Sequence, residues 1–309
     1  MVILGIDIGG TSTKVVIARA DGEATLEVLA VARSVSYRKP TVRELTAAAA
    51  GAMAQLLGTS DVLTAAAVDG TLRLGVCVPG IVDPETGVVN RSVNLPNLVG
   101  HSITDLLRGV VTKAVKGTPA GQMPVVLVSD ALATAMDWHH GHAGEQNGRT
   151  LCVVLGTGVG AAVLDDGVPL TVTGKSAGHI GQMDVSLSDL QPVPVGPDGG
   201  EGSLEAYIGL PALLAAYGPK VREAAMKWDG TEPPVRALVR AIRIGIAMYR
   251  PERVVLMGGV GLLLRPLLPK IDAAVHLRLT SLAKPNWKLL VADDDLHAAR
   301  GAARAAVGG

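Results

Sequence analysis

One short unit occurs twice in this chain and constrains its fold more than any other feature. Val2–Ile8 is an apolar run of β type that ends at a Gly-Gly bend over 9–10, and an extended run resumes over 14–20. Residues 151–164 repeat this arrangement around a glycine-rich bend at 156–160. A hairpin that recurs after about half the chain indicates a duplicated fold, in which each half supplies an equivalent loop.

The rest of the chain mixes strand and helix patterns. Short apolar runs that end at Pro, Gly or Ser predict buried strands, and Ala-rich periodic segments with caps predict helices. Asp21-Gly22 and Asp166-Gly167 are typical hairpin turns. We expect further strands at 26–35, 72–78, 125–128 and 254–257, and helices at 41–57, 103–115, 204–217, 235–249, 296–307 and after Ser129-Asp130, which would cap that helix. This mixture predicts an α/β protein.

Composition narrows the range of functions. The 309 residues suffice for two domains or one large one, and 28 basic residues against 28 acidic ones give a net charge of zero. A neutral chain with 2% aromatic residues favours neither nucleic acid nor an anionic membrane as partner. We read no signal peptide at the N-terminus and no run long enough for a membrane helix, so we expect a cytoplasmic protein. Cys77 and Cys152 both lie in apolar runs, which predicts small buried side chains.

The two glycine bends are either plain turns or phosphate-binding loops. Glycine allows positive φ in turns, and without a Cβ it also lets backbone N–H groups approach a phosphate closely. A Walker loop would need Gly-Lys followed by Ser or Thr, but here Thr11 follows Gly10 and Lys14 lies in a strand-like run. The second bend has GxGxG spacing and leads into a strand, unlike a dinucleotide-binding fingerprint.

A set of short motifs follows a defined order along nearly the whole chain. The set consists of GIDIGGTSTK from residue 5, VPGIVDPETG from 78, NLPNL from 94, LVSDALATAM from 127, LGTGVGAAVLDDG from 155, GKSAGHIGQMDV from 174 and VVLMGGVG from 254. Each motif alone is weak, but the ordered set resembles the ROK family of sugar kinases, whose motifs occur in the same order.

The resemblance implies a fold and a division into lobes. The fold would be α/β, a two-lobed actin-like (ribonuclease H-like) ATPase fold with a cleft between the lobes. The N-terminal lobe would comprise residues 1–125, completed by a C-terminal helix at about 295–309, and the C-terminal lobe residues 126–294. No helix-turn-helix segment precedes the first motif, so DNA binding is not expected. A homodimer is expected from the resemblance only.

The resemblance also implies ATP-dependent phosphorylation of a sugar hydroxyl, with ATP and Mg²⁺ as cofactors. Asp130 matches the family's catalytic base, and Asp7 matches the carboxylate that orients Mg²⁺ through water. The residues expected to bind the nucleotide are Asp7, Gly9, Gly10, Thr11, Lys14, Gly156, Thr157, Gly158, Gly258 and Gly259. Simpler readings stay open: Asp130 as a helix N-cap, Asp7 as an ordinary polar residue at a strand end, Lys14 as a solvated strand residue, and the last two glycines as a turn.

Sugar recognition is where this chain departs from the family pattern. The residues expected at the acceptor are Asn94, Asn97, Ser129, Asp130, His179, Gln182 and Glu205. Ser129 replaces an Asn, His179 replaces a sugar-binding Glu, and Gln182 replaces a His that also binds zinc. Because an imidazole can donate a hydrogen bond where a carboxylate only accepts, we expect a changed acceptor, such as an acidic, phosphorylated or otherwise substituted sugar or polyol.

The family's structural zinc is not expected in this chain. The segment that carries its cysteines aligns with Gly196, Asp198, Ser203 and Glu205, and no cysteine remains there. A structural zinc site needs Cys or His ligands, usually four of them. The Pro- and Gly-rich segment 189–202 must therefore be ordered in another way.

Two further classes of function stay open. Because of the substitutions at 129, 179 and 182, the chain could be a sugar- or nucleotide-binding sensor with little catalysis. It could also use another phosphoryl donor, such as polyphosphate, or phosphorylate an acceptor that is not a sugar. His139, His140 and His142 are typical of a solvated helix end, with a metal site as the minor alternative.

Overall fold

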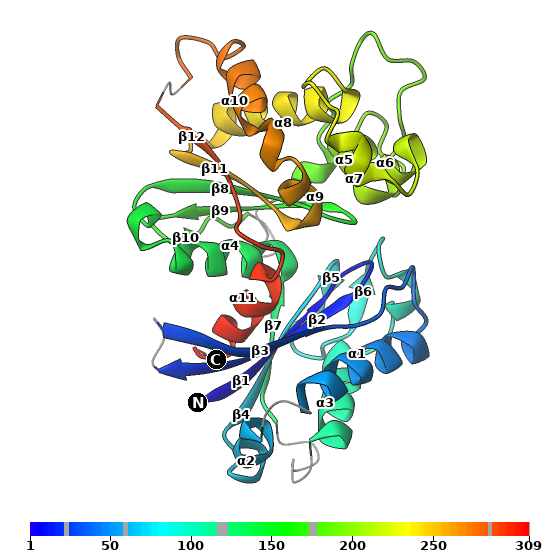
Figure 1. Cartoon of the computed structure of the whole chain (residues 1–309), viewed down its shortest axis with the longest axis vertical. Helices are drawn as coiled ribbons and strands as arrows, with labels where there is room; N and C mark the ends of the chain where they lie inside the picture. Colours follow the sequence, from blue (N-terminus) through cyan, green and yellow to red (C-terminus); the bar gives the residue numbers. More distant parts are fainter. Residues whose placement is uncertain (22–24, 58–60, 116–122, 173–177, 284–285, 309) are drawn as a thin grey trace. The chain divides into compact units, whose positions relative to one another are not determined.

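A computed structural model describes residues 1–21, 25–57, 61–115, 123–172, 178–283 and 286–308. The chain forms two compact units, each with its own sheet and core (Figure 1). The first unit comprises Met1–His140 and Leu296–Gly309, and the second comprises Gly141–Asp295. The chain therefore passes between the units twice, after His140 and before Leu296.

The first unit is built on a five-stranded sheet in the order β3-β2-β1-β4-β7. β1 is antiparallel to β2, as β2 is to β3, whereas β1, β4 and β7 are parallel. These strands are β1 Val2–Ile8, β2 Thr13–Asp21, β3 Thr25–Arg33, β4 Leu72–Val78 and β7 Val125–Ser129, and a separate two-stranded ribbon pairs β5 Ile81–Val82 with β6 Val89–Arg91.

Helices cover both faces of this sheet, so β1 is buried on both sides. Successive side chains of a strand point to opposite faces. Leu4, Ile6 and Ile8 accordingly belong to one core, whereas Ile3 belongs to another core that the C-terminal helix closes (Figure 1). The helices are α1 Val42–Leu57, α2 Val62–Val68, η1 Pro96–Leu98, α3 Ile103–Ala114, α4 Asp130–Gly141 and α11 His297–Ala305.

The second unit has a sheet with the same topology, in the order β10-β9-β8-β11-β12. Its strands are β8 Arg149–Leu155, β9 Val159–Asp165, β10 Val168–Pro169, β11 Arg253–Met257 and β12 Lys288–Val291. β8 and β9 form an antiparallel hairpin, and β11 is parallel to both β8 and β12. In each sheet a glycine-bend hairpin is followed by parallel strands, which confirms the duplication.

Helices of the second unit pack against this sheet around a core of aliphatic side chains and two tryptophans, Trp228 and Trp287. The helical segments of this unit are η2 Ala143–Glu145, η4 Ile180–Gln182, α5 Leu204–Ile208, α6 Leu210–Tyr217, α7 Val221–Ala225, α8 Pro233–Tyr249, α9 Gly258–Leu263, η5 Arg265–Leu267 and α10 Leu268–His276. Among the described residues, none of the helices combines the length and apolarity that crossing a membrane requires.

Four features differ from the sequence-based expectations. The helix expected over 204–217 is interrupted at Gly209, where α5 ends and α6 begins. β7 and α4 lie in the first unit, because β7 pairs with β4, whereas the expected lobe boundary fell between residues 125 and 126. The glycines at 258–259 begin helix α9 rather than forming a simple turn. α2, α7, α10 and β12 were not expected.

Of the two hairpin turns expected from the sequence, the structure describes only one completely. Asp166-Gly167 joins β9 to β10 with both residues at positive φ, 49° and 82°, as a tight hairpin requires. Gly22, the second residue of the other expected turn, lies outside the described residues. Cys77 and Cys152 are buried free thiols, as expected.

Candidate active site

The first glycine loop, Gly9–Ser12, joins β1 to β2 and is braced by Tyr37. Within the loop, the Gly9 N–H donates to the Ser12 carbonyl at 3.0 Å. The Tyr37 hydroxyl donates to the Gly9 carbonyl at 2.8 Å, and the Tyr37 N–H donates to the Thr11 carbonyl at 2.8 Å. Burial raises the pKa of Tyr37, so its hydroxyl stays a donor. Tyr37 was not predicted from the sequence, because it lies 28 residues from Gly9 and belongs to no motif.

Asp7 and Lys14 lie opposite each other in the β1–β2 register and form an ion pair at 3.3 Å. The Lys14 side chain is only 16% exposed, so the alternative of a solvated strand residue does not hold. The Cys77 thiol on β4 lies 3.6 Å from the other oxygen of Asp7. Burial, followed by the charge of Asp7, raises the pKa of Cys77 well above its usual value, so this thiol is not a nucleophile.

Asp130 follows β7 directly and is the first residue of α4. The capping bond of this helix comes from Ser129, whose Oγ accepts from the Leu132 N–H at 3.4 Å. Asp130 Oδ1 accepts from the N–H of Ala131 at 2.8 Å. Burial raises the pKa of Asp130, the hydrogen bond from Ala131 lowers it, and the negative charge of Asp7 raises it further, with a net upward shift. The carboxylate is therefore a better proton acceptor than an exposed aspartate.

The parallel strands bring these groups to one edge of the first sheet. Asp7 lies near the carboxyl end of β1 and Asp130 follows that of β7, with β4 between them. In α/β sheets, ligands bind outside the carboxyl ends of the strands. This edge of the first unit therefore holds two carboxylates, one lysine ammonium group and a glycine loop.

The segment with Asn94 and Asn97 is tied to the same edge. Ser92 Oγ donates to the carbonyl of Pro79, immediately after β4, and accepts from the Leu95 N–H. Asn97 Nδ2 donates to the carbonyl of Lys39 at 2.8 Å, so its amide group holds a neighbouring loop. Asn94 is half-buried beside this turn.

The second glycine loop, Gly156–Gly158, joins β8 to β9 in the second unit. The Gly156 N–H donates to the Gly158 carbonyl at 2.9 Å, and the Gly156 carbonyl accepts from the Leu210 N–H at 2.9 Å. Glu205 Oε2 accepts from the N–H of Val159 at 2.8 Å. The loop is therefore held by the junction between α5 and α6.

Glu205 is the buried carboxylate of this unit, with 7% of the residue exposed. Burial raises its pKa, the hydrogen bond from Val159 lowers it, and the charge of Asp198 raises it, with a net upward shift. Sequence reasoning placed Glu205 among the acceptor residues. Its contact with the second glycine loop was not foreseen, since the two segments are 46 residues apart.

His179 precedes the short helix η4 and Gln182 is its last residue, and both side chains are exposed. η4 packs closely on the hairpin strand β9, since a Cβ on Gly181 would lie 2.3 Å from the carbonyl oxygen of Val159. The two residues expected at the acceptor are thus carried on a segment that packs beside the second glycine loop.

Two arginines of α8 hold the segment that begins at Asp184. Arg236 forms a two-pronged ion pair with Asp189, at 2.8 and 2.6 Å, and Arg240 donates to the Ser186 carbonyl. Ser203, which aligns with a zinc ligand of the family, caps α5 by accepting from the Ala206 N–H. These contacts order the segment with protein groups alone. The absence of zinc stays a prediction.

Gly258 and Gly259 lie at the end of β11, in the same unit as the second loop. Gly258 has φ 77°, and a Cβ there would lie 2.4 Å from the Leu155 carbonyl oxygen. Only glycine fits such a position. A Cβ on Gly259 would meet nothing within 4 Å, so this backbone is open to a ligand.

The three histidines near the end of α4 differ from the solvated helix end that was expected. His139 is buried, and its ring lies edge-on to that of His140 at 5.8 Å. His142 Nε2 lies 3.2 Å from a carboxylate oxygen of Asp293. In the part of the chain that the structure describes, no three His, Cys, Asp or Glu side chains are grouped to hold a metal ion.

Two sheets of the same order, each with a glycine loop between its first two antiparallel strands, define the class of two-lobed actin-like α/β proteins. Within that class, the ROK family model matches residues 3–307, and the chain belongs to the ROK family. This confirms the fold class and the family that the motifs predicted.

Relatives of different function resemble this chain. The glucokinase of Thermotoga maritima is 24% identical over 286 residues, which cover 84% of this chain and 82% of the relative. A ROK family glucokinase from Streptomyces griseus, solved with glucose and AMPPNP, has a TM-score of 0.73 at 20% identity, with all of both chains covered. A ROK family transcriptional regulator, a homologue of the E. coli MLC protein, has a TM-score of 0.67 at 18% identity, covering 99% of this chain and 77% of that one.

Proposed function

We propose that this protein is an ATP-dependent kinase that phosphorylates a hydroxyl group of a sugar or sugar derivative. The observation that carries the proposal is Asp130, a carboxylate with a raised pKa at the carboxyl end of β7, beside the Asp7–Lys14 pair. Such a carboxylate suits a general base that takes a proton from a hydroxyl group. The sugar kinases among the relatives support the same reaction class.

The residues present fit a nucleotide and Mg²⁺. A Cβ on Gly156 would meet only the Gly158 carbonyl oxygen, at 4.0 Å, so the second loop offers open backbone at its bend. The residues that would hold the nucleotide phosphates are Gly9, Gly10, Thr11, Lys14, Gly156, Thr157 and Gly158, with Gly258 and Gly259 on the adenosine side. Asp7 would hold Mg²⁺ through water. The cation, when bound, neutralises negative charge on the transferring phosphoryl group.

Asp130, Lys14 and Ser129 have the remaining roles in the proposed reaction. Asp130 accepts the proton of the attacking hydroxyl, which makes the acceptor oxygen a better nucleophile. Lys14 supplies positive charge at the first glycine loop, and Asp7 holds its ammonium group in place at 3.3 Å. Ser129, through its bond to Leu132, fixes the start of the helix that carries Asp130.

The acceptor residues favour a substituted sugar or polyol. His179 supplies a donor as well as an acceptor where the family's carboxylate would supply acceptors alone, and the Gln182 amide also offers both. Asn94 and Glu205 complete the set, whereas the Asn97 amide is engaged with Lys39 and acts on the acceptor only indirectly. We therefore expect glucose and N-acetylmannosamine to be poor acceptors.

A second candidate function is a sugar- or nucleotide-binding sensor. It is favoured by the changes at Ser129, His179 and Gln182, and by the similarity to a transcriptional regulator. The homodimer and the cytoplasmic location also stay predictions. Light scattering of the purified chain tests the first, and cell fractionation the second.

The test is an ADP-release screen with Mg-ATP against neutral, amino, acidic and phosphorylated sugars and polyols. A kinase gives at least one acceptor whose turnover is lost in Asp130→Asn. Polyphosphate in place of ATP tests the other donor. If the wild type binds ATP and a sugar in calorimetry yet turns over no acceptor, the sensor replaces the kinase.

A further inference from the structure

The Glu205 carboxylate is aimed at the exit of the second glycine loop. Its Oε2 accepts from the N–H of Val159 at 2.8 Å, and Val159 is the first residue of β9 after the bend. Val159 pairs with Leu155 across the hairpin, so this bond acts where the loop leaves the sheet. A hydrogen bond from a backbone N–H to a carboxylate is stronger than one to a neutral acceptor.

The entry of the same loop rests on the next residues of the same segment. The Leu210 N–H donates to the carbonyl of Gly156 at 2.9 Å. A Cβ on Gly209 would lie 2.8 Å from the Glu205 carbonyl oxygen and 3.4 Å from that of Thr157, so the backbones pack without an intervening side chain. Both limbs of the loop are thus held by residues 205–210.

We propose that Glu205 is a positioning residue for the donor-phosphate loop, which it holds by its bond to the Val159 N–H, in addition to the acceptor role expected from its motif. The inference rests on the proposed function, since it takes Gly156–Gly158 as the loop that binds the phosphates. Loss of the bond leaves the backbone N–H groups of the loop less well oriented, and nucleotide affinity falls even when no acceptor is present.

Two substitutions separate positioning from acceptor binding. Glu205→Gln removes the charge but keeps a side-chain oxygen that can accept from Val159. Glu205→Ala removes the acceptor altogether. A residue that only contacts the sugar would leave nucleotide affinity unchanged in both variants. If Glu205 positions the loop, Glu205→Ala binds the nucleotide weakly, whereas Glu205→Gln keeps an affinity near that of the wild type.

The experiment measures binding of AMPPNP with Mg²⁺ by calorimetry in the absence of sugar. We expect Glu205→Gln to bind within about threefold of the wild type and Glu205→Ala to bind about tenfold more weakly, since the Val159 N–H then lacks its side-chain acceptor. Glu223→Ala, an exposed glutamate of α7 in the same unit, is the matched control and should bind like the wild type.

Hydrogen exchange of the peptide that spans residues 155–160 gives a readout that needs no ligand. Exchange should accelerate in Glu205→Ala and stay near the wild-type rate in Glu205→Gln. If Glu205→Ala fails to fold, Glu205→Asp replaces it, because its shorter side chain draws the carboxylate back from Val159. Wild-type affinity and exchange in the Ala or Asp variant would overturn the inference. Absence of AMPPNP binding by the wild type would overturn the proposed kinase and, with it, the donor-loop role.

Discussion

At the scale of single residues, the proposed base Asp130 is a carboxylate that lowers the stability of the fold when it is ionised. Burial and the nearby charge of Asp7 raise its pKa, so folding favours its protonated form. Its contribution to stability is present below the ordinary value of 3.8 and is lost as the pH rises through the higher folded pKa. At neutral pH the ionised group therefore destabilises the fold.

Asp130→Asn should accordingly lower kcat and raise the melting temperature at pH 7. General-base catalysis accounts for about 100- to 10,000-fold in rate, so we expect a loss of that size. The gain in melting temperature should shrink as the pH falls toward 3. Thermal scans from pH 3 to 8, with turnover measured on the same preparations, check both effects. A variant that keeps full activity would remove Asp130 from its role.

The pH profile of the wild type supplies an independent test of the same group. Because the base must be ionised, the acid limb of kcat/KM should lie above the ordinary aspartate value of 3.8. Measurement of initial rates between pH 3.5 and 8 locates the limb. A limb at or below 3.8 would show that the active carboxylate is not the one with the raised pKa.

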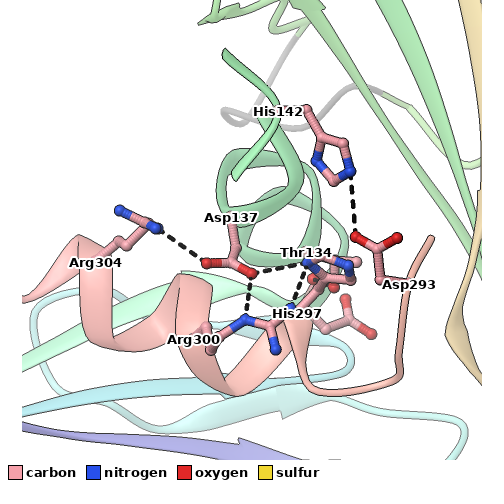
Figure 2. A network of polar contacts seen from close by, with 8 residues as sticks. Thr134, Asp137, His142, Asp293, His297, Arg300 and Arg304 are labelled. Atoms are coloured by element: carbon pink, nitrogen blue, oxygen red, sulfur yellow. Dashed lines mark hydrogen bonds and ion pairs between the residues drawn. The ribbon is translucent and has the colours of Figure 1, made fainter. Parts of the chain in front are cut away.

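Asp137, one turn from the end of α4, is a buried carboxylate whose pKa is lowered, whereas that of Asp130 is raised. Its Oδ2 accepts from His297 Nδ1 and from Arg300 Nε, both at 2.7 Å, and its Oδ1 accepts from Arg304 Nε at 2.9 Å (Figure 2). Burial raises its pKa, but the hydrogen bond from His297 and the positive charges of α11 outweigh this and lower the pKa. Its stabilising contribution is present above the ordinary value and is lost as the pH falls through the folded pKa.

Asp137→Asn should therefore destabilise the first unit strongly at pH 7. The substitution leaves two arginines with no buried counter-charge, and breaking a buried pair in this way costs about 3–5 kcal/mol. Urea unfolding at pH 7 measures the loss. Asp69→Asn, at an exposed helix end, serves as control and should stay within about 0.5 kcal/mol of the wild type.

At the scale of elements, α11 packs against β1 and β4 with backbone in contact with backbone. A Cβ on Gly5 would lie 2.0 Å from the Ala299 carbonyl oxygen, and one on Gly75 would lie 1.8 Å from that of Ala302. On the other side of the helix, a Cβ on Gly301 would lie 1.8 Å from the Ala133 carbonyl oxygen of α4. Glycine is therefore required at these positions for close approach rather than for a turn.

Two alanine substitutions test this packing with opposite expected signs. Gly75→Ala forces α11 away from the sheet and should cost about 1–3 kcal/mol or more. Gly51→Ala lies within α1, where a Cβ meets nothing within 4 Å, and should stabilise the protein by about 0.5–1 kcal/mol. Denaturant titration of both variants gives the comparison. A Gly75→Ala variant that loses no stability relative to Gly51→Ala would contradict the close packing of α11 on β4.

At the scale of the whole molecule, the first unit is completed by the far end of the chain. α11 covers Ile3, Val16 and Ala18 on one side and approaches Cys77 and Ala133 through Ala302. Without α11, residues 1–140 would therefore leave apolar side chains on one face of their sheet uncovered. Each unit carries its own glycine loop, at residues 9–12 in the first and 156–158 in the second.

Removal of residues 296–309 should leave the first unit unable to fold. The deletion exposes an apolar sheet face that α11 buries, and it removes the partners of the buried Asp137 carboxylate. We expect loss of cooperative unfolding and an insoluble or proteolysed chain on expression. Removal of residues 308–309 alone should leave the melting temperature unchanged. A soluble, cooperatively folded protein without α11 would contradict the role of this helix.

The sequence by itself determined the elements whose pattern is local. The ends of β1 and β4 agree with the apolar runs over 2–8 and 72–78, and α1 begins after Thr41, whose reciprocal bonds with Glu44 form a capping box. The ordered motifs also identified the family, because glycine bends and the residues around Asp130 are readable without any distant contact. Burial of the two cysteines followed from their apolar neighbours.

Only the tertiary structure decided which distant groups meet. Tyr37 braces the first glycine loop across 28 residues, Glu205 reaches the second across 46, and Asp137 meets its arginine partners across more than 160. Such contacts depend on strand order and helix packing, which leave no periodic signature in the chain. At Gly209 the break between α5 and α6 coincides with close packing of its backbone on the second loop, and Pro211 stands in the first turn of α6. Local propensity decides where strands and helices form, but long-range packing decides what each carboxylate does.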